Sequence, residues 1–145
     1  RGVSGIDGST STAFGAAIIN NGPTVLITGD LSFIYDTNAL WNQSPPKNLK
    51  IIVVNNEGGG IFKIIPGPKE TPYAKEFFET QHDVKLENLA KAHKINFNST
   101  DNIDDASNKL KHLFSNDKTE ILEIKTGNIN NEDILMDYFK AIKTN

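Results

Sequence analysis

Short apolar runs alternate along this chain with segments whose apolar residues recur at helical spacing. The runs TVLIT and LKIIVV are apolar and rich in β-branched residues, which is typical of strands covered on both faces. A third run, EILEIK, alternates apolar and polar residues as a strand does. The pattern therefore predicts strands at Thr24–Thr28, Leu49–Val54 and Glu120–Lys125.

Helical spacing marks the segments between and around these runs. Ser9–Asn20 is rich in small and apolar residues, with Asp7 or Ser9 as its predicted N-cap, and Asn21-Gly22-Pro23 ends it. Further helices are predicted at Ser32–Asn42, Tyr73–Glu79, Lys85–His93, Asp104–Phe114 and Glu132–Ile142.

Strands that alternate with helices indicate a parallel sheet with helices packed on both of its faces. The predicted fold class is therefore α/β, a three-layer sandwich around a mainly parallel sheet. The 145 residues are enough to bury a core. No internal repeat or linker divides the sequence, so a single domain is expected over residues 1–145.

Composition narrows the function classes. The net charge of −3, without any Lys run, argues against a nucleic-acid partner, and no apolar stretch is long enough for a membrane span. The absence of Cys excludes disulfides and thiolate metal sites. A cytoplasmic location is the default expectation. The sequence begins in mid-motif on Arg-Gly without Met, so we expect it to be a piece of a longer polypeptide.

Polar residues follow the first two predicted strands at the point where each strand ends. Asp30 comes after the first strand, and Asn55-Asn56 with a glycine run at 58–60 comes after the second. The carboxyl ends of neighbouring parallel strands share one edge of the sheet, where such folds bind ligands. A carboxylate, a carboxamide and a backbone carbonyl suit Mg²⁺, which keeps further positions for phosphate oxygens. The pair predicts a magnesium-bound diphosphate.

The alternative is that Asp30 is an ordinary helix N-cap and that residues 55–60 form an ordinary loop. Either half alone favours this alternative, since a strand followed by Asp and a helix is common in α/β folds. The occurrence of both halves at the ends of successive strands favours the metal-diphosphate interpretation.

The same residues carry a family resemblance. Gly29-Asp30 followed by Asn55-Asn56 resembles the cofactor motif of thiamine-diphosphate enzymes, which usually reads Gly-Asp-Gly ahead of Asn-Asn. Leu31 replaces the second Gly, and the form GDLS is found in one branch. The blocks RGVSGIDG, GDLSFIYDTNAL and IIVVNNEGGGIF resemble that branch, the MenD family of menaquinone biosynthesis, and they span the first half of the chain. The second half matches only in its α/β pattern.

The resemblance implies a thiamine-diphosphate-binding, Rossmann-like fold and a role for individual residues. It makes Asp30, the Asn56 side chain and the Gly58 carbonyl ligands of Mg²⁺, or of Mn²⁺ in its place. Asn55 is expected to support the turn. Ile6 would be the apolar wedge that bends the cofactor. The residues that would contact the diphosphate and the aminopyrimidine are Ser4, Gly5, Ile6, Gly29, Leu31, Ser32 and Gly59.

The resemblance also implies substrate contacts. Ile61, Phe62 and Ile65 would line the pocket for 2-oxoglutarate and isochorismate, although Ile65 replaces the Leu more usual there. Arg1 is the single Arg of the chain, and its planar guanidinium suits a substrate carboxylate. For Phe62 and Ile6 an alternative stays open, which is that each is an ordinary residue of the hydrophobic core without contact to substrate or cofactor.

The implied reaction is the decarboxylation of 2-oxoglutarate on thiamine diphosphate, with addition of the product to isochorismate. The activating Glu of such enzymes lies in a different domain of a partner subunit, and no segment here resembles that domain. We therefore expect this chain to be the pyrophosphate-binding domain, inactive alone, with the rest of the polypeptide and a second subunit as partners. An exposed apolar patch is expected around Phe33, Trp41 and Phe62, and the three His residues are expected to be solvated.

Three rival interpretations are weighed. Another thiamine-diphosphate carboligase or decarboxylase, of the acetolactate synthase kind, usually keeps Gly after the Asp. A flavodoxin-like phosphate-binding or signalling module would need a carboxylate cluster at the strand ends, where this chain has Asn55-Asn56. A nucleotide-binding Rossmann domain would need a glycine fingerprint after the first strand, which is missing.

Overall fold

A parallel four-stranded sheet forms the centre of the computed structural model, which describes residues 5–42, 44–127 and 129–143. The strands are β1 (Thr24–Gly29), β2 (Leu49–Asn55), β3 (Asn96–Thr100) and β4 (Glu120–Lys125). They lie in the order β1-β2-β4-β3, and all three pairings are parallel. The carboxyl ends of the described strands therefore all lie at one edge of the sheet, and this is the edge at which such folds bind ligands.

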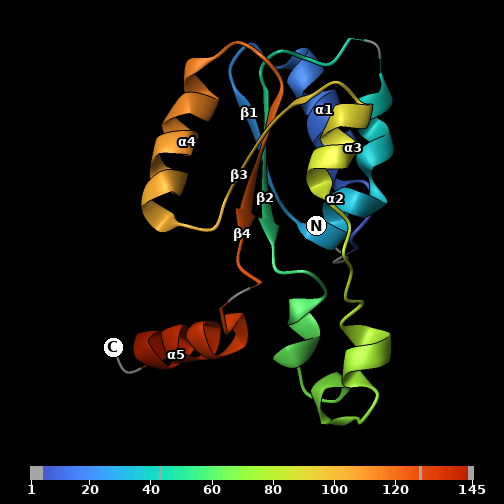
Figure 1. Ribbon diagram of the computed structural model, residues 1–145, viewed down its shortest axis with the longest axis vertical. Helices are drawn as coiled ribbons and strands as arrows, with labels where there is room; N and C mark the ends of the chain where they lie inside the picture. The colour runs from blue at the N-terminus through green and yellow to red at the C-terminus, as the bar shows by residue number, and fades with distance from the viewer. Residues whose placement is uncertain (1–4, 43, 128, 144–145) are drawn as a thin grey trace.

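Helices cover both faces of the sheet (Figure 1). On one side lie α1 (Ser9–Ile19), α2 (Asp30–Tyr35) and α3 (Leu86–Ala92), and on the other lies α4 (Ile103–Ser115). The alternation of side chains along β2 joins the layers, because Leu49, Ile51 and Val53 enter the first core while Ile52 enters the second. The three-layer α/β prediction is confirmed.

The strand β3 was not predicted from the sequence. Its residues NFNST are mostly polar, and only the last of them is buried. It forms the edge of the sheet, where it pairs with β4 through a register that sets Phe97 beside Ile121. Pairing with β4, more than 20 residues away along the chain, rather than its own composition, makes this segment a strand.

The helix predicted at Ser32–Asn42 is two shorter pieces. The first is α2, which already begins at Asp30, and a 3₁₀ helix, η1 (Thr37–Trp41), follows it. Asp36 separates them, and its buried carboxylate accepts hydrogen bonds from the Ser11 amide and hydroxyl, both at 2.6 Å. The helix is interrupted at Asp36, whose side chain bonds the first turn of α1.

The same contact corrects the predicted start of α1. Its N-cap is Gly8, with φ 72°, and neither Asp7 nor Ser9 caps it with a side chain. The carboxylate of Asp36, 25 residues away along the chain, meets the Ser11 amide in the first turn instead. A tertiary contact here replaces the local cap that the sequence suggested.

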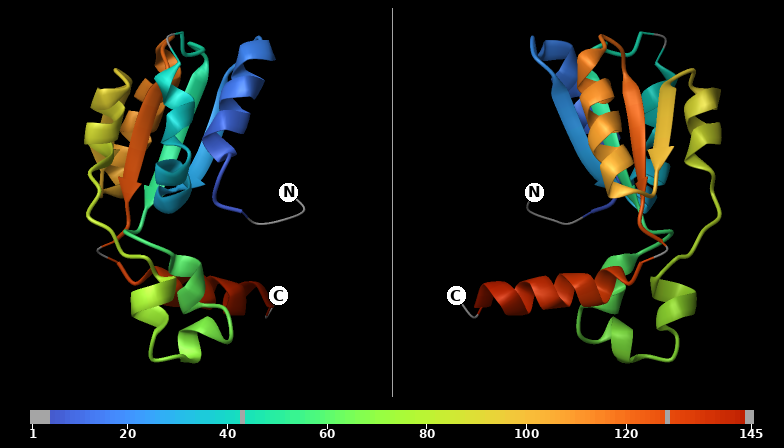
Figure 2. Two further views of the ribbon diagram at one scale, coloured as in Figure 1. Left: turned by 90° about the vertical axis from the view of Figure 1, so that its right-hand side faces the viewer. Right: turned by 60° about the vertical axis from the view of Figure 1, so that its left-hand side comes forward.

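Short helical turns and the last helix lie beyond the carboxyl ends of the strands (Figure 2). The turns are η2 (Gly60–Lys63), η3 (Pro68–Glu70) and η4 (Ala74–Phe78), and the helix is α5 (Asn131–Lys143). Phe33 is fully buried in the first core, so the patch predicted around it is wrong at that residue, although Trp41 is exposed. Across the described residues, no helix combines the length and apolarity needed to cross a bilayer.

Candidate functional site

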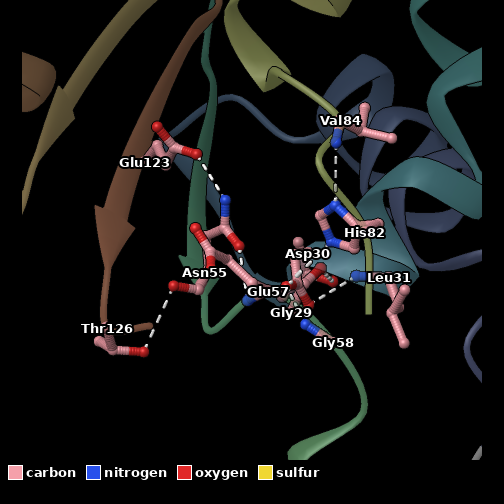
Figure 3. Close-up of polar contacts among 11 residues, drawn as sticks. Gly29, Asp30, Leu31, Asn55, Glu57, Gly58, His82, Val84, Glu123 and Thr126 are labelled. Carbon is pink, nitrogen blue, oxygen red and sulfur yellow. Dashed lines mark hydrogen bonds and ion pairs between the residues drawn. The ribbon is translucent and has the colours of Figure 1, made fainter. Parts of the chain in front are cut away.

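The Asp30 carboxylate joins the ends of β1 and β2 (Figure 3). It follows β1 directly and is only 2% exposed. One oxygen, Oδ1, accepts a hydrogen bond from the Leu31 amide at 2.7 Å, and Oδ2 accepts one from the Gly58 amide at 2.9 Å. The two strand ends therefore meet at one point, as expected for neighbouring parallel strands.

The glycine run after β2 brings its backbone unusually close to neighbouring groups. Gly58 has φ 153°, and a Cβ there would lie 2.5 Å from the Glu79 carbonyl oxygen. A Cβ on Gly60 would lie 2.4 Å from Nδ2 of Asn56. At Gly58 the overlap is with backbone, so a side chain there would push the loop away from Glu79, whereas at Gly60 the end of the Asn56 side chain would have to move.

Asn55 and Asn56 have different roles. Asn55 is buried, its Nδ2 donates to Oε1 of Glu123 at 2.7 Å, and its Oδ1 accepts from the Glu57 amide at 2.9 Å. This confirms the prediction that Asn55 supports the turn. Asn56 is half-buried, and no hydrogen bond within the described part of the chain engages its carboxamide. Its side chain is therefore available to a ligand.

A cavity of about 470 Å³ opens at this edge of the sheet. Most of the residues predicted to bind cofactor or substrate line it: Ile6, Gly29, Asp30, Leu31, Ser32, Asn56, Gly58, Gly59 and Ile61. They come from the segment before α1, the end of β1, the start of α2, the loop after β2 and η2. Lining residues that were not predicted come from η2, the segment after β4 and α5, and include Lys63, Thr126, Glu132 and Leu135.

The Ser32 hydroxyl ties the segment before α1 to α2. Its Oγ donates to the Ile6 carbonyl at 2.6 Å and lies 3.2 Å from Oγ of Ser9. This bond holds the backbone of Ile6 at the cavity, where its side chain stays 42% exposed. Ile6 is therefore presented to the cavity instead of packing in the core.

Several predicted residues lie elsewhere. Phe62 is half-buried against Phe78, with ring centroids 5.6 Å apart, and lines a different hollow. Ile65 is half-buried and Gly5 lies beside Asp7, and neither lines the 470 Å³ cavity. Arg1 and Ser4 are outside the described residues.

His82 is a residue that sequence reasoning assigned wrongly. It was expected to be solvated, but its side chain is 11% exposed and its Nε2 lies 3.2 Å from Oδ2 of Asp30. No local signal could have found it, because the contact joins residues 52 positions apart. Glu123 was likewise missed, and it is buried between Asn55 and the Ser99 hydroxyl, which donates to it at 2.6 Å.

The donor set at the cavity fits a hard cation. Among residues 5–42, 44–127 and 129–143, no cluster of three or more His, Cys, Asp or Glu side chains is arranged to hold a metal. A cation here would depend on one carboxylate, a carboxamide, backbone carbonyl oxygen and oxygens of the ligand. Mg²⁺ is commonly bound in this way together with substrate phosphates, so the residues present fit the implied metal.

Comparison with known proteins identifies the family. Residues 2–124 match the family described as "Thiamine pyrophosphate enzyme, C-terminal TPP binding domain". The chain belongs to this family. As a TPP-binding domain it is 50% identical over 143 residues to the 2-succinyl-5-enolpyruvyl-6-hydroxy-3-cyclohexene-1-carboxylate synthase of Flavobacterium johnsoniae. It is 41% identical over 145 residues to the synthase of the same name from Christiangramia forsetii.

These matches cover 98% and 99% of this chain but 26% and 25% of the two relatives. The chain thus spans about a quarter of the length of these curated relatives. Since they are synthases of the MenD type, the resemblance predicted from the three sequence blocks is confirmed.

Solved structures share the fold of the TPP-binding domain. A thiamine diphosphate-dependent 4-hydroxybenzoylformate decarboxylase from Rhodococcus jostii RHA1 superposes with TM-score 0.65 at 24% identity, over 79% of this chain and 22% of that one. Benzoylformate decarboxylase from Polynucleobacter necessarius superposes with TM-score 0.65 at 19% identity, over 81% and 22%. At these identities the likeness supports the fold alone.

Proposed function

We propose that this chain is the diphosphate-binding part of a menaquinone-biosynthesis synthase of the MenD type and holds thiamine diphosphate through a divalent cation. The observation that carries the proposal is the junction of two strand ends at Asp30, whose carboxylate accepts a hydrogen bond from the Gly58 amide and which lines one cavity together with Asn56. The names of the most similar relatives support the choice of enzyme.

In this proposal, the cation is Mg²⁺, or Mn²⁺ in its place, and its protein ligands are Asp30, the Asn56 side chain and the Gly58 carbonyl. That carbonyl accepts a hydrogen bond from the Gly60 amide at 3.1 Å. A carbonyl oxygen has two lone pairs, so it can also face a cation. The Asp30 carboxylate contributes the negative charge that draws the cation to the edge of the sheet.

The diphosphate would lie at the start of α2, where the Leu31 amide and the Ser32 hydroxyl can donate to it in place of their present bonds to Asp30 and Ile6. Gly29 and Gly59 would border it in the cavity. Ile6 would buttress the bend of the cofactor, because its branched side chain is stiff and already faces the cavity. Ser4 and Gly5 would meet the aminopyrimidine.

Thiamine diphosphate supplies the carbon nucleophile for a 2-oxo acid. The proposed reaction is the decarboxylation of 2-oxoglutarate and the addition of the resulting unit to isochorismate. Ile61, Phe62, Ile65 and Arg1 are proposed to contact these substrates. The activating Glu is proposed to come from a second subunit, and the isolated chain is therefore proposed to be inactive.

Calorimetry of the full-length parent protein with thiamine diphosphate, with and without Mg²⁺, tests the cofactor site. We expect binding that requires the metal and that Asp30→Ala weakens by about 100-fold or more, since it removes the only charged ligand. Asp101→Ala is the matched control, because Asp101 follows β3 as Asp30 follows β1 but is exposed and outside the cavity. Metal-independent binding, or equal loss in both variants, would contradict the proposal.

A product assay tests the reaction separately. The full-length protein with 2-oxoglutarate and isochorismate should release carbon dioxide and form the adduct of the two substrates. Condensation of two pyruvate molecules without any adduct from isochorismate would instead favour an enzyme of the acetolactate synthase kind.

A further inference from the structure

His82 approaches Asp30 from outside the 470 Å³ cavity. Its Nε2 lies 3.2 Å from Oδ2 of Asp30, yet His82 does not line the cavity that Asp30 and Asn56 line. Instead it lines two smaller hollows, one of which it shares with Asn56. The imidazole therefore contacts the Asp30 carboxylate without lining the cavity in which the cation is proposed to lie.

The hydrogen bonds of the ring assign its tautomer. Nδ1 accepts a hydrogen bond from the Val84 amide at 3.3 Å, so Nδ1 carries no proton (Figure 3). The proton lies on Nε2, which therefore donates to Oδ2 of Asp30. Both ring nitrogens are used, and the side chain is held in one orientation.

The backbone around His82 is fastened to the loop that carries Gly58. The Gly59 amide donates to the Glu79 carbonyl, and a Cβ on Gly58 would lie 3.5 Å from the Cα of Gln81. The segment 79–82 therefore packs directly on residues 58 and 59. As a result, the imidazole and the Gly58 amide come from two segments that pack on each other, and both meet the same carboxylate oxygen.

We propose that His82 is a positioning residue that orients the Asp30 carboxylate for the divalent cation. The inference rests on the proposed function, in which Asp30 is a metal ligand. A hydrogen bond from outside fixes the plane of a ligating carboxylate and lowers the cost of ordering it when the metal binds. Without His82, the carboxylate loses the only side-chain donor that the described residues offer it. Its other present partners are the backbone amides of Leu31 and Gly58, and the first of these is proposed to donate to the diphosphate instead.

Binding of Mn²⁺ to the full-length protein in the presence of thiamine diphosphate, measured by electron paramagnetic resonance at one fixed pH, tests the inference. We expect His82→Ala to weaken Mn²⁺ binding about 10- to 100-fold, the usual effect of losing a partner of a metal ligand. His112→Ala is the matched control, because His112 lies exposed near the end of α4, and it should bind Mn²⁺ like the wild type.

Two further variants separate positioning from general damage to the fold. His82→Gln should restore binding to within about 3-fold of wild type, because the amide nitrogen of Gln can take the place of Nε2. His82→Asn should not, because its amide nitrogen corresponds to Nδ1 and stops short of Asp30. Equal binding by the Gln and Asn variants would overturn the inference even if the Ala variant failed to fold.

The same titration distinguishes the two proposals. Loss of Mn²⁺ binding in Asp30→Ala together with wild-type binding in His82→Ala would overturn the role of His82 and leave the proposed function standing. Wild-type binding in Asp30→Ala would overturn the proposed function, and the role of His82 with it.

Discussion

Asp30 is a charged residue that is almost fully buried, and its surroundings account for this. Burying an unpaired carboxylate is costly, and hydrogen-bond donors offset that cost. Asp30 accepts from the Leu31 and Gly58 amides and from Nε2 of His82. The carboxylate is thereby held in place before any ligand arrives, which is a requirement of a pre-formed site.

Gly58 provides a test at the scale of one residue. Gly58→Ala should lower the free energy of unfolding by about 2–4 kcal/mol, through backbone strain and the overlap with the Glu79 carbonyl. Urea denaturation of this chain followed by circular dichroism measures the change.

Gly15→Ala is the control for that experiment. Gly15 lies within α1, and a Cβ there would meet no atom within 4 Å. Ala should stabilise the helix by about 0.5–1 kcal/mol, because it restricts the unfolded chain and favours helix. Unchanged stability of Gly58→Ala would show that the loop after β2 is not packed as described.

At the scale of elements, α4 begins with a well-formed cap. The Asn102 side chain accepts hydrogen bonds from the Asp104 and Asp105 amides at 2.8 and 3.1 Å. This cap was not predicted, although Asn is a typical N-cap residue. The acidic residues of the first turn add a favourable interaction with the helix dipole.

Asn102→Ala should therefore lower the free energy of unfolding by about 1 kcal/mol. Asn102→Asp should keep most of the stabilisation that the cap provides, because Asp is also a good N-cap residue. Asn108→Ala is the matched control, since Asn108 is exposed within the same helix and Ala has the higher helix propensity. Thermal melting measures all three. A loss in Asn108→Ala as large as that in Asn102→Ala would contradict the capping role.

A buried lysine in β2 gives the stability a pH dependence. Lys50 is 3% exposed, and its Nζ donates to the carbonyls of Asn116 and Lys118. Burial lowers the pKa of Lys50 from its ordinary value of 10.5, while Glu120 and Asp117 oppose the shift. Between the lowered pKa and 10.5, the unfolded chain binds more protons than the folded chain. Stability from this residue therefore rises as the pH rises through that alkaline window.

Lys50→Met should remove that rise. The prediction is measured as the difference in unfolding free energy between variant and wild type across the alkaline range, which cancels the titration of the other lysines. Lys47→Met, at an exposed position nearby, should leave the slope unchanged. A slope in Lys50→Met equal to that of wild type would contradict the assignment.

At the scale of the whole molecule, α5 is a helix without a covered face. None of its residues is buried, and Ile134, Tyr138 and Ile142 are 58%, 60% and 52% exposed at a spacing of four. A helix with an apolar stripe normally packs against another element. Because the chain spans about a quarter of its curated relatives, we expect the rest of the polypeptide to cover this stripe.

The exposed stripe predicts how the isolated chain behaves. The double variant Ile134→Ser, Ile142→Ser should bind less hydrophobic dye than this chain with its own sequence, and light scattering should show less self-association. In the full-length protein, the same change should lower the melting temperature by several degrees, because covered apolar contacts are lost. Ile103→Ser, at an exposed site on α4, should do neither.

The sequence by itself determined three of the four strands, the layered fold and the two motifs of the site. Buried parallel strands need continuous apolar runs, and TVLIT and LKIIVV are such runs whatever packs on them. Asp30 and Asn56 were also accessible to sequence reasoning, because each lies just beyond the end of a strand that the pattern predicts.

Only the tertiary structure decided the rest. β3 is a strand because β4 lies beside it, the helix after β1 breaks because Asp36 turns to α1, and His82 reaches Asp30 across 52 residues. Local pattern reports which surface a segment must bury. It does not predict a polar contact between two residues that lie far apart in the sequence and meet only after the sheet has formed. Contacts of that kind shape the surroundings of this site.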